Sequence, residues 1–132
     1  MRKIDRLYLV DDDSLFKFLT QRVIQDTDLV DKVEVFSNGL EAINHLNEIK
    51  ETPAQLPDVI LLDIDMPVMD GWGFLEEYGK LLPELDRKIT TYIVSSSNDP
   101  ADISRSKTFA EVKDFIIKPI TKQKFIEMVK AL

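Results

Sequence analysis

Five short apolar runs alternate with segments in which apolar residues recur every three or four positions. The runs cover residues 7–10, 33–36, 59–62, 91–94 and 115–117, and they carry the apolar and β-branched residues typical of strands. The segments between them have the spacing of amphipathic helices. Strands that alternate with helices pair in parallel through right-handed crossovers, which places helices on both faces. The pattern therefore predicts an α/β fold with a doubly wound, five-stranded parallel sheet.

Capping residues locate most of the helices. Starts are predicted at Ser14, Asn38, Asp99 and Thr121, where a side-chain oxygen precedes an apolar period. A further helix with a heavy apolar face is expected over residues 72–82.

The apolar periods also predict which side of each helix faces the core. The first helix is expected over residues 14–25, and the residues expected to face inward from it are Leu15, Phe16, Leu19, Val23 and Ile24. In the second helix the corresponding residues are Leu40, Ile43, Leu46 and Ile49, and in the fourth they are Ile103, Phe109 and Val112.

Four of the five predicted strands are followed by polar residues that suggest a reactive or metal-binding site. Asp11 and Asp12 follow the first, Asp63 the third, Ser95 the fourth and Lys118 the fifth. Because the carboxyl ends of parallel strands meet at one edge of a sheet, we expect these side chains to gather in the crevice where such folds bind ligands. If the first and third strands are neighbours, their carboxylates lie close together. Carboxylates that crowd in this way either rise in pKa or hold a cation, and Mg²⁺ prefers oxygen ligands of this kind.

A carboxylate beside Mg²⁺ is equipped to attack phosphorus. Asp63 would form an acyl phosphate, while the metal and the Lys118 ammonium stabilise charge on the phosphoryl oxygens. The Ser95 hydroxyl would donate a hydrogen bond to another phosphoryl oxygen. The strand ends therefore predict a magnesium-dependent phosphoacceptor.

Composition indicates the cellular compartment of the protein and the class of molecule that it binds. The chain has 132 residues, enough for one domain, with 44% hydrophobic and 31% charged residues. It has no cysteine, which excludes disulfides and thiolate sites and favours a cytoplasmic location. No apolar run approaches the roughly 20 residues that span a bilayer. The formal net charge of -7 argues against nucleic acid and anionic membrane as partners and favours protein.

These features together resemble the receiver (CheY-like) domain of two-component response regulators. The resemblance rests on the Asp11-Asp12 pair, Asp63 before Met-Pro and Asp-Gly, Ser95 after the fourth strand, and Lys118-Pro119 after the fifth. It implies a flavodoxin-like sheet of strand order 2-1-3-4-5 and a single receiver domain over residues 1–132 with no output domain. Such a domain is a signalling protein that catalyses only its own phosphorylation and dephosphorylation.

The resemblance also implies roles for individual residues. Asp63 accepts a phosphoryl group from a histidine kinase or a histidine phosphotransfer protein. Mg²⁺ is held by Asp12, by Asp63 and by the backbone carbonyl of Asp65, with Asp11 acting through water. Ser95 and Phe115 form a switch that remodels the face made by the fourth helix, the fifth strand and the fifth helix. A downstream protein target docks there, or else the domain relays its phosphoryl group to another protein. Basic residues on that face suggest an acidic or mixed-charge partner, and they are Arg105, Lys107, Lys122 and Lys124.

Two positions differ from the usual receiver pattern. Asp65 places an acid two residues after Asp63, and Ser97 occupies the matching position after Ser95. Both positions line the approach of water, so the lifetime of the acyl phosphate is not inherited from the family. Residues 108–114 contain no glycine and only one alanine, Ala110, where small residues are common before the fifth strand, which predicts an altered end of the fourth helix.

Two other functions fit parts of the sequence. A haloacid-dehalogenase-like phosphatase would use Asp63 as nucleophile and Asp65 as acid, but that motif normally follows the first strand, and the usual cap has no room here. A flavin-binding module shares the fold class, but the loop after the first strand would then be rich in Ser, Thr and Gly rather than Asp.

Overall fold

Five strands alternate with five α-helices over the part of the chain that the structure describes. The structure is a computed structural model, and it describes residues 4–132. The strands are β1 (Ile4–Val10), β2 (Val30–Phe36), β3 (Val59–Leu62), β4 (Thr90–Ser95) and β5 (Val112–Ile117). The helices are α1 (Ser14–Thr27), α2 (Gly39–Ile49), α3 (Gly71–Leu81), α4 (Pro100–Ser106) and α5 (Lys122–Lys130). Short 3-10 turns, η1 (Pro53–Gln55) and η2 (Leu82–Glu84), lie in the connections after α2 and α3.

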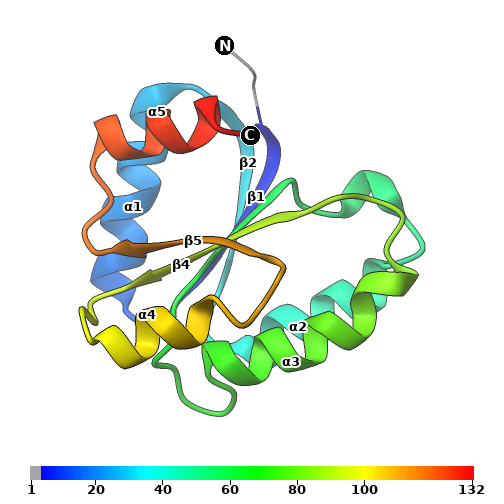
Figure 1. Cartoon of the computed structure of the whole chain (residues 1–132). Helices are drawn as coiled ribbons and strands as arrows, with labels where there is room; N and C mark the ends of the chain where they lie inside the picture. Colours follow the sequence, from blue (N-terminus) through cyan, green and yellow to red (C-terminus); the bar gives the residue numbers. More distant parts are fainter. Residues whose placement is uncertain (1–3) are drawn as a thin grey trace.

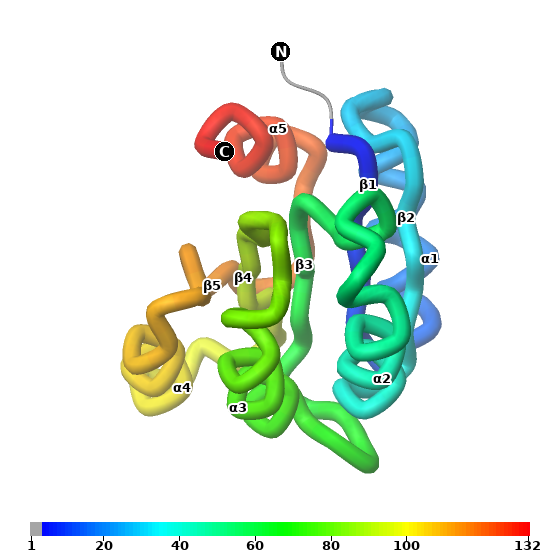
Figure 2. The backbone as a smooth tube through the Cα atoms, turned by 90° about the vertical axis from the view of Figure 1, so that its right-hand side faces the viewer, coloured from blue at the N-terminus to red at the C-terminus, as the bar shows by residue number. Residues whose placement is uncertain are grey.

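All strand pairs in the sheet are parallel, and the strand order is β2-β1-β3-β4-β5 (Figure 2). β1 lies between β2 and β3, where Val10 is opposite Phe36 on one side and Leu62 on the other. The predicted doubly wound architecture is confirmed. The end of β1 is therefore adjacent to the end of β3.

Helices cover both faces of the sheet. α1 and α5 pack on one face, and α2, α3 and α4 lie in a row on the other (Figures 1 and 2). Each face has its own apolar core, and β3 contributes to both because its four residues are all buried. No helix within residues 4–132 is long and apolar enough to cross a bilayer.

The apolar face of α1 differs from the prediction. Phe16 and Ile24 are buried, but Leu15 and Leu19 are 66% and 52% exposed, and Phe18 is 54% exposed. The helix carries apolar residues on two sides, and only the side that includes Phe16 meets the sheet. The cap also differs, because Asp13 rather than Ser14 accepts a hydrogen bond from the backbone N–H of Phe16. In α2, Ile43, Leu46 and Ile49 are buried as predicted, but Leu40 is 38% exposed.

The fourth helix is shorter than its apolar spacing suggested. Asp99 caps it and Pro100 begins it, as predicted, but it ends at Ser106. Phe109 lies in the connection after the helix, and Val112 is the first residue of β5 rather than part of the helix. Val112 instead pairs with Thr91 of β4. A longer helix would have left backbone N–H and C=O groups of β4 without a partner strand at this position.

Gly71 begins α3 where the helix meets the loop after β3. A Cβ atom on Gly71 would lie 2.3 Å from the carbonyl oxygen of Asp63 and 2.9 Å from the Cα of Ile64. Only glycine lets the two backbones approach so closely. Gly79, by contrast, is exposed inside the same helix, and the nearest atom to its Cβ position would be 3.9 Å away, on the Glu111 side chain.

These two glycines predict opposite effects of the same substitution. Gly79→Ala is expected to raise the free energy of unfolding by about 0.5–1 kcal/mol, because alanine loses less conformational entropy in a helix. Gly71→Ala is expected to lower it by more than about 1 kcal/mol, since backbone must move to relieve the clash. Urea unfolding of both variants checks this pair, and a stabilised Gly71→Ala variant would contradict the close approach.

Candidate functional site

Backbone hydrogen bonds bring two carboxylates together at the end of the sheet. The N–H of Asp11 donates to the carbonyl of Phe36 at 3.0 Å, and the N–H of Asp63 donates to the carbonyl of Val10 at 2.9 Å. The parallel ladder thus continues one residue past β1 and β3. Because each aspartate directly follows its strand, both side chains are positioned by the rigid sheet rather than by a mobile loop.

Three carboxylates converge at this edge. One carboxylate oxygen from each of Asp11, Asp12 and Asp63 lies within 4.8 Å of the other two. Asp11 is 1% exposed and Asp63 is 6% exposed, whereas Asp12 lies open to solvent. The buried pair and the exposed third carboxylate form an acidic site with one open side.

Lys118 brings a positive charge to the same site. Its ammonium lies 2.8 Å from Asp11 Oδ2 and 3.8 Å from Asp63 Oδ2, so its nearest carboxylate is Asp11. The backbone N–H of Lys118 donates to the carbonyl of Ser95, which fixes the residue beside β4. The ammonium also lies 4.1 Å from the ring centroid of Phe16, the buried apolar residue in the first turn of α1. This cation–π contact could not be predicted from the sequence, because nothing in the spacing of Phe16 and Lys118 relates them.

One ammonium does not neutralise three carboxylates. Burial raises the pKa of Asp63 to about 7, and repulsion by the Asp11 carboxylate adds to the rise. The Lys118 charge and the Ile64 N–H, which donates to Asp63 Oδ1 at 2.9 Å, lower the pKa of Asp63 only in part, and Asp65 raises it. A further positive charge is needed to keep Asp63 ionised well below neutral pH.

The donor set fits a hard divalent cation. Asp11 Oδ2 is buried and accepts no hydrogen bond from residues 4–132, although it forms the close ion pair with Lys118. Carboxylate oxygens with solvent on one side match the coordination of Mg²⁺, which retains several water ligands. Asp65 lies exposed in the loop after β3, two residues beyond Asp63.

Ser95 ends β4 beside the acidic site. It is fully buried, and its Oγ accepts a hydrogen bond of 3.1 Å from the backbone N–H of Ser97. The Ser97 hydroxyl points to α4, where it donates to Asp102 at 2.7 Å. The sequence did not identify this second contact. Ser97 is therefore engaged with the helix, although its position in the sequence suggested that it faces water.

Phe115 lies in β5, opposite Ile93 of β4 and three residues before Lys118. Its ring is half-buried and packs against the apolar core on the α2 and α3 face. A half-buried aromatic ring at an edge strand has room to change its exposure.

The raised pKa of Asp63 predicts a pH-dependent stability. An aspartate in the unfolded chain ionises near pH 4, so the native state holds an extra proton between about pH 4 and 7, and wild-type stability falls as pH rises through this range. Asp63→Asn removes the charge. In metal-free buffer it is expected to stabilise the protein by on the order of 2 kcal/mol at pH 8 and by little at pH 4. Urea unfolding across this pH range is the measurement.

Glu76→Gln is the matched control, because it makes the same carboxylate-to-amide change at an exposed site on α3. Adding Mg²⁺ at pH 8 should stabilise the wild type and leave Asp63→Asn almost unchanged. A stability difference between wild type and Asp63→Asn that is flat from pH 4 to 8 would contradict the raised pKa.

Comparison with known proteins connects this geometry to one family. Residues 7–130 match the response regulator receiver domain. The chemotaxis protein CheY of Listeria monocytogenes is 28% identical over 125 residues, which are 95% of each chain. A protein-glutamate methylesterase/protein-glutamine glutaminase of Methanospirillum hungatei is 36% identical over 113 residues, which are 84% of this chain and 30% of that protein. The chain thus spans less than a third of that relative's length.

Solved structures agree with the sequence relatives. A two-component response regulator from Cytophaga hutchinsonii superposes with a TM-score of 0.88 at 30% identity, covering 98% of this chain and 97% of that one. These matches lend no support to the haloacid-dehalogenase alternative. The acidic strand ends, the sheet order and the relatives agree, and the chain belongs to the receiver domain family of two-component response regulators.

Proposed function

We propose that Asp63 is the phosphoacceptor of this receiver domain. The convergence of Asp11, Asp12 and Asp63 with the Lys118 ammonium carries the proposal, because it combines a nucleophile, a cation site and a charge partner for a phosphoryl group. The donor would be the phosphohistidine of a histidine kinase or of a histidine phosphotransfer protein.

The transfer exchanges one phosphorus bond for another. A carboxylate oxygen of Asp63 attacks phosphorus, the P–N bond to the donor imidazole breaks, and the leaving nitrogen regains its electron pair and is protonated. The Ile64 N–H fixes the plane of the Asp63 carboxylate through Oδ1, which orients the group for in-line attack. Lys118, already 3.8 Å from Asp63 Oδ2, balances the charge that arrives with the phosphoryl group.

The same residues would hold the metal. Asp12 and Asp63 are the proposed carboxylate ligands, the backbone carbonyl of Asp65 is the third protein ligand, and Asp11 acts through water. Bound Mg²⁺ supplies Lewis-acid stabilisation of the phosphoryl oxygens. Asp11 is the most buried of these carboxylates and is paired with Lys118, which suits a residue that holds a water ligand and positions the lysine rather than contacting the ion.

Ser95 and Phe115 are the proposed readout. A phosphoryl oxygen on Asp63 offers the Ser95 hydroxyl a charged acceptor, and a hydrogen bond donated to it is stronger than the one that Ser95 Oγ now accepts from the Ser97 N–H. Movement of this hydroxyl would free space along β4, and the half-buried Phe115 ring on β5 would turn inward. The local charge change thereby alters the face formed by α4, β5 and α5.

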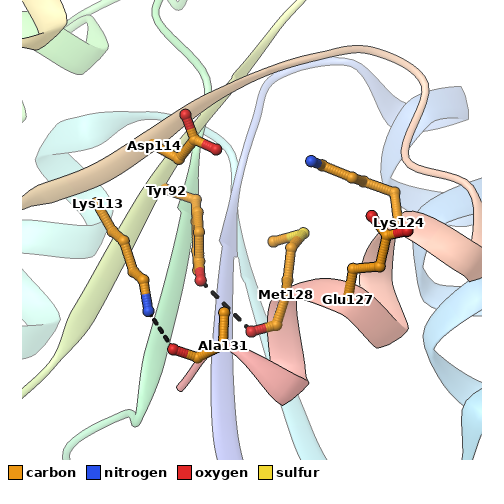
Figure 3. Close-up of a pocket in the computed structure, with 7 residues that line it drawn as sticks. All are labelled: Tyr92, Lys113, Asp114, Lys124, Glu127, Met128 and Ala131. Atoms are coloured by element: carbon orange, nitrogen blue, oxygen red, sulfur yellow. Dashed lines mark hydrogen bonds between the residues drawn. The ribbon is translucent and has the colours of Figure 1, made fainter.

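A protein partner is proposed to dock on that face. A shallow hollow of about 150 Å³ lies between β5 and α5, where Tyr92 donates to the Met128 carbonyl and Lys113 donates to the Ala131 carbonyl (Figure 3). It is too small for a nucleotide or flavin site. Lys124 and Glu127 also line it, and this mixture of signs favours a partner with both charges.

The phosphoacceptor assignment predicts a single modification. Incubation with acetyl phosphate and Mg²⁺ is expected to add one phosphoryl group to the wild-type protein, and intact mass with peptide mapping should locate it on Asp63. Asp63→Asn should abolish the modification, and chelation of Mg²⁺ should slow it strongly. Asp65→Asn is the control, since it changes a neighbouring side chain but keeps the backbone carbonyl.

Modification that persists in Asp63→Asn would exclude this residue as the acceptor. Sustained turnover of phosphoesters, measured as release of inorganic phosphate, would favour a phosphatase instead.

The switch assignment predicts a change at Phe115. On addition of beryllofluoride and Mg²⁺, which mimic the acyl phosphate, the NMR signals of the Phe115 ring are expected to shift. Ser95→Ala should bind the mimic but lose most of the ring response, because the hydroxyl that creates the space is missing. Unchanged ring signals in wild-type protein that has bound the mimic would contradict the switch.

A further inference from the structure

α4 is held to the rest of the fold by few buried residues. It has 7 residues and is the shortest α-helix within residues 4–132, and Ser106 is its one buried residue. α3 buries six residues, among them Phe74, Leu75 and Tyr78. A helix with so little buried surface is positioned mainly by individual side-chain contacts.

The last turn of α4 rests on the one tryptophan of the chain. The Arg105 guanidinium carbon lies 4.5 Å from the centroid of the Trp72 ring, and the Phe109 ring stacks on Trp72 at 5.9 Å with an interplanar angle of 20°. Trp72 is only 7% exposed. This is a favourable cation–π geometry, and tryptophan is the strongest of the aromatic acceptors. The Arg105 side chain is exposed, but its guanidinium lies over the Trp72 ring instead of extending freely from the basic docking face.

Trp72 is fixed relative to the acceptor loop. It is the second residue of α3, directly after Gly71, whose N–H donates to the Ile64 carbonyl at 2.9 Å. The close approach of Gly71 to the Asp63 backbone leaves this start of α3 no room to move. Arg105 is therefore attached to the segment that carries the acceptor.

The first turn of α4 is attached to the other side of the site. Asp102 accepts a hydrogen bond of 2.7 Å from the Ser97 hydroxyl, and the Ser97 N–H donates one of 3.1 Å to Ser95 Oγ. A displacement of α4 would pull on Ser97 and so on the hydrogen bond that Ser95 accepts. The two ends of α4 thus connect Trp72 with the buried serine.

We propose that Arg105 is a positioning residue for the phosphorylation site. Its contact with Trp72 holds α4 in place. Through Asp102 and Ser97, α4 in turn holds Ser95 in the arrangement in which Ser95 Oγ accepts a hydrogen bond from the Ser97 N–H. A group on Asp63 that attracts the Ser95 hydroxyl must therefore overcome the contact between Arg105 and Trp72. The inference rests on the proposed function, since it concerns the regulation of the same site.

The test uses the fluorescence of Trp72 together with ¹⁹F NMR of bound beryllofluoride. In the wild type, beryllofluoride and Mg²⁺ are expected to change the Trp72 emission as Arg105 leaves the ring. In Arg105→Gln, the emission without ligand should already be shifted toward the ligand-bound value. The beryllofluoride concentration at half-saturation should fall roughly two- to five-fold, because the mimic no longer has to break an exposed cation–π contact.

Three variants separate positioning from general effects. Lys107→Gln removes one positive charge at the C-terminal cap of the same helix without a ring contact, so its midpoint should equal that of the wild type. Arg105→Lys keeps the charge but loses the planar group, so its midpoint should fall between the wild-type and Arg105→Gln values. Trp72→Phe, followed by ¹⁹F NMR alone, should shift the midpoint in the same direction as Arg105→Gln, and the double variant should shift it no further than the larger single shift.

The outcomes distinguish this inference from the phosphoacceptor assignment. Beryllofluoride that binds wild type and Arg105→Gln with equal midpoints, and with no change in Trp72 emission, overturns the role of Arg105 and leaves Asp63 as the acceptor. Equal shifts in Lys107→Gln and Arg105→Gln also overturn it, since net charge would then explain the effect. Absence of any bound ¹⁹F signal in the wild type overturns the proposed function itself.

Discussion

Repulsion between two buried carboxylates is the constraint on which this site depends. Asp11 and Asp63 follow neighbouring parallel strands, and backbone hydrogen bonds to Phe36 and Val10 hold both residues in the extended ladder. The backbones of the two residues cannot move apart without breaking the sheet. Lys118 offsets part of the repulsion and is itself tied to β4 through the Ser95 carbonyl. Burial and the remaining negative charge together raise the pKa of Asp63, and the excess charge favours a cation at this site.

The surroundings of the site differ in how firmly they are packed. On one side, α3 buries an apolar face and begins at Gly71 in direct contact with the Asp63 backbone. On the other side, α4 is short and is positioned by single contacts such as Arg105 with Trp72. A change of charge at Asp63 therefore acts on one firmly packed helix, α3, and on one weakly held helix, α4. Any structural response is therefore expected to pass to α4, where the least free energy opposes it.

Exposed apolar residues on α1 show what helical spacing leaves undetermined about a helix. Leu15, Phe18 and Leu19 lie on the solvent side of a helix that is equally apolar on its core side. Helical spacing places residues on a common face, but it does not say which of two apolar faces meets the sheet. The same limit applies to α4, where Phe109 and Val112 continued a helical period that the chain does not follow. Pairing of Val112 in β5 overrode that period, because sheet hydrogen bonds and burial outweigh a weak local preference.

The sequence by itself determined the number of strands, their alternation with helices, the parallel sheet and the residues at which the strands end. These features follow from local signals: short apolar runs, capping side chains such as Asn38 and Thr121, and polar residues where a buried run must stop. Only the tertiary structure decided that Lys118 pairs most closely with Asp11, that Phe16 lies under its ammonium, and that Arg105 rests on Trp72. These contacts join residues far apart in the chain. Their geometry depends on how whole layers pack, and no spacing along the sequence encodes that.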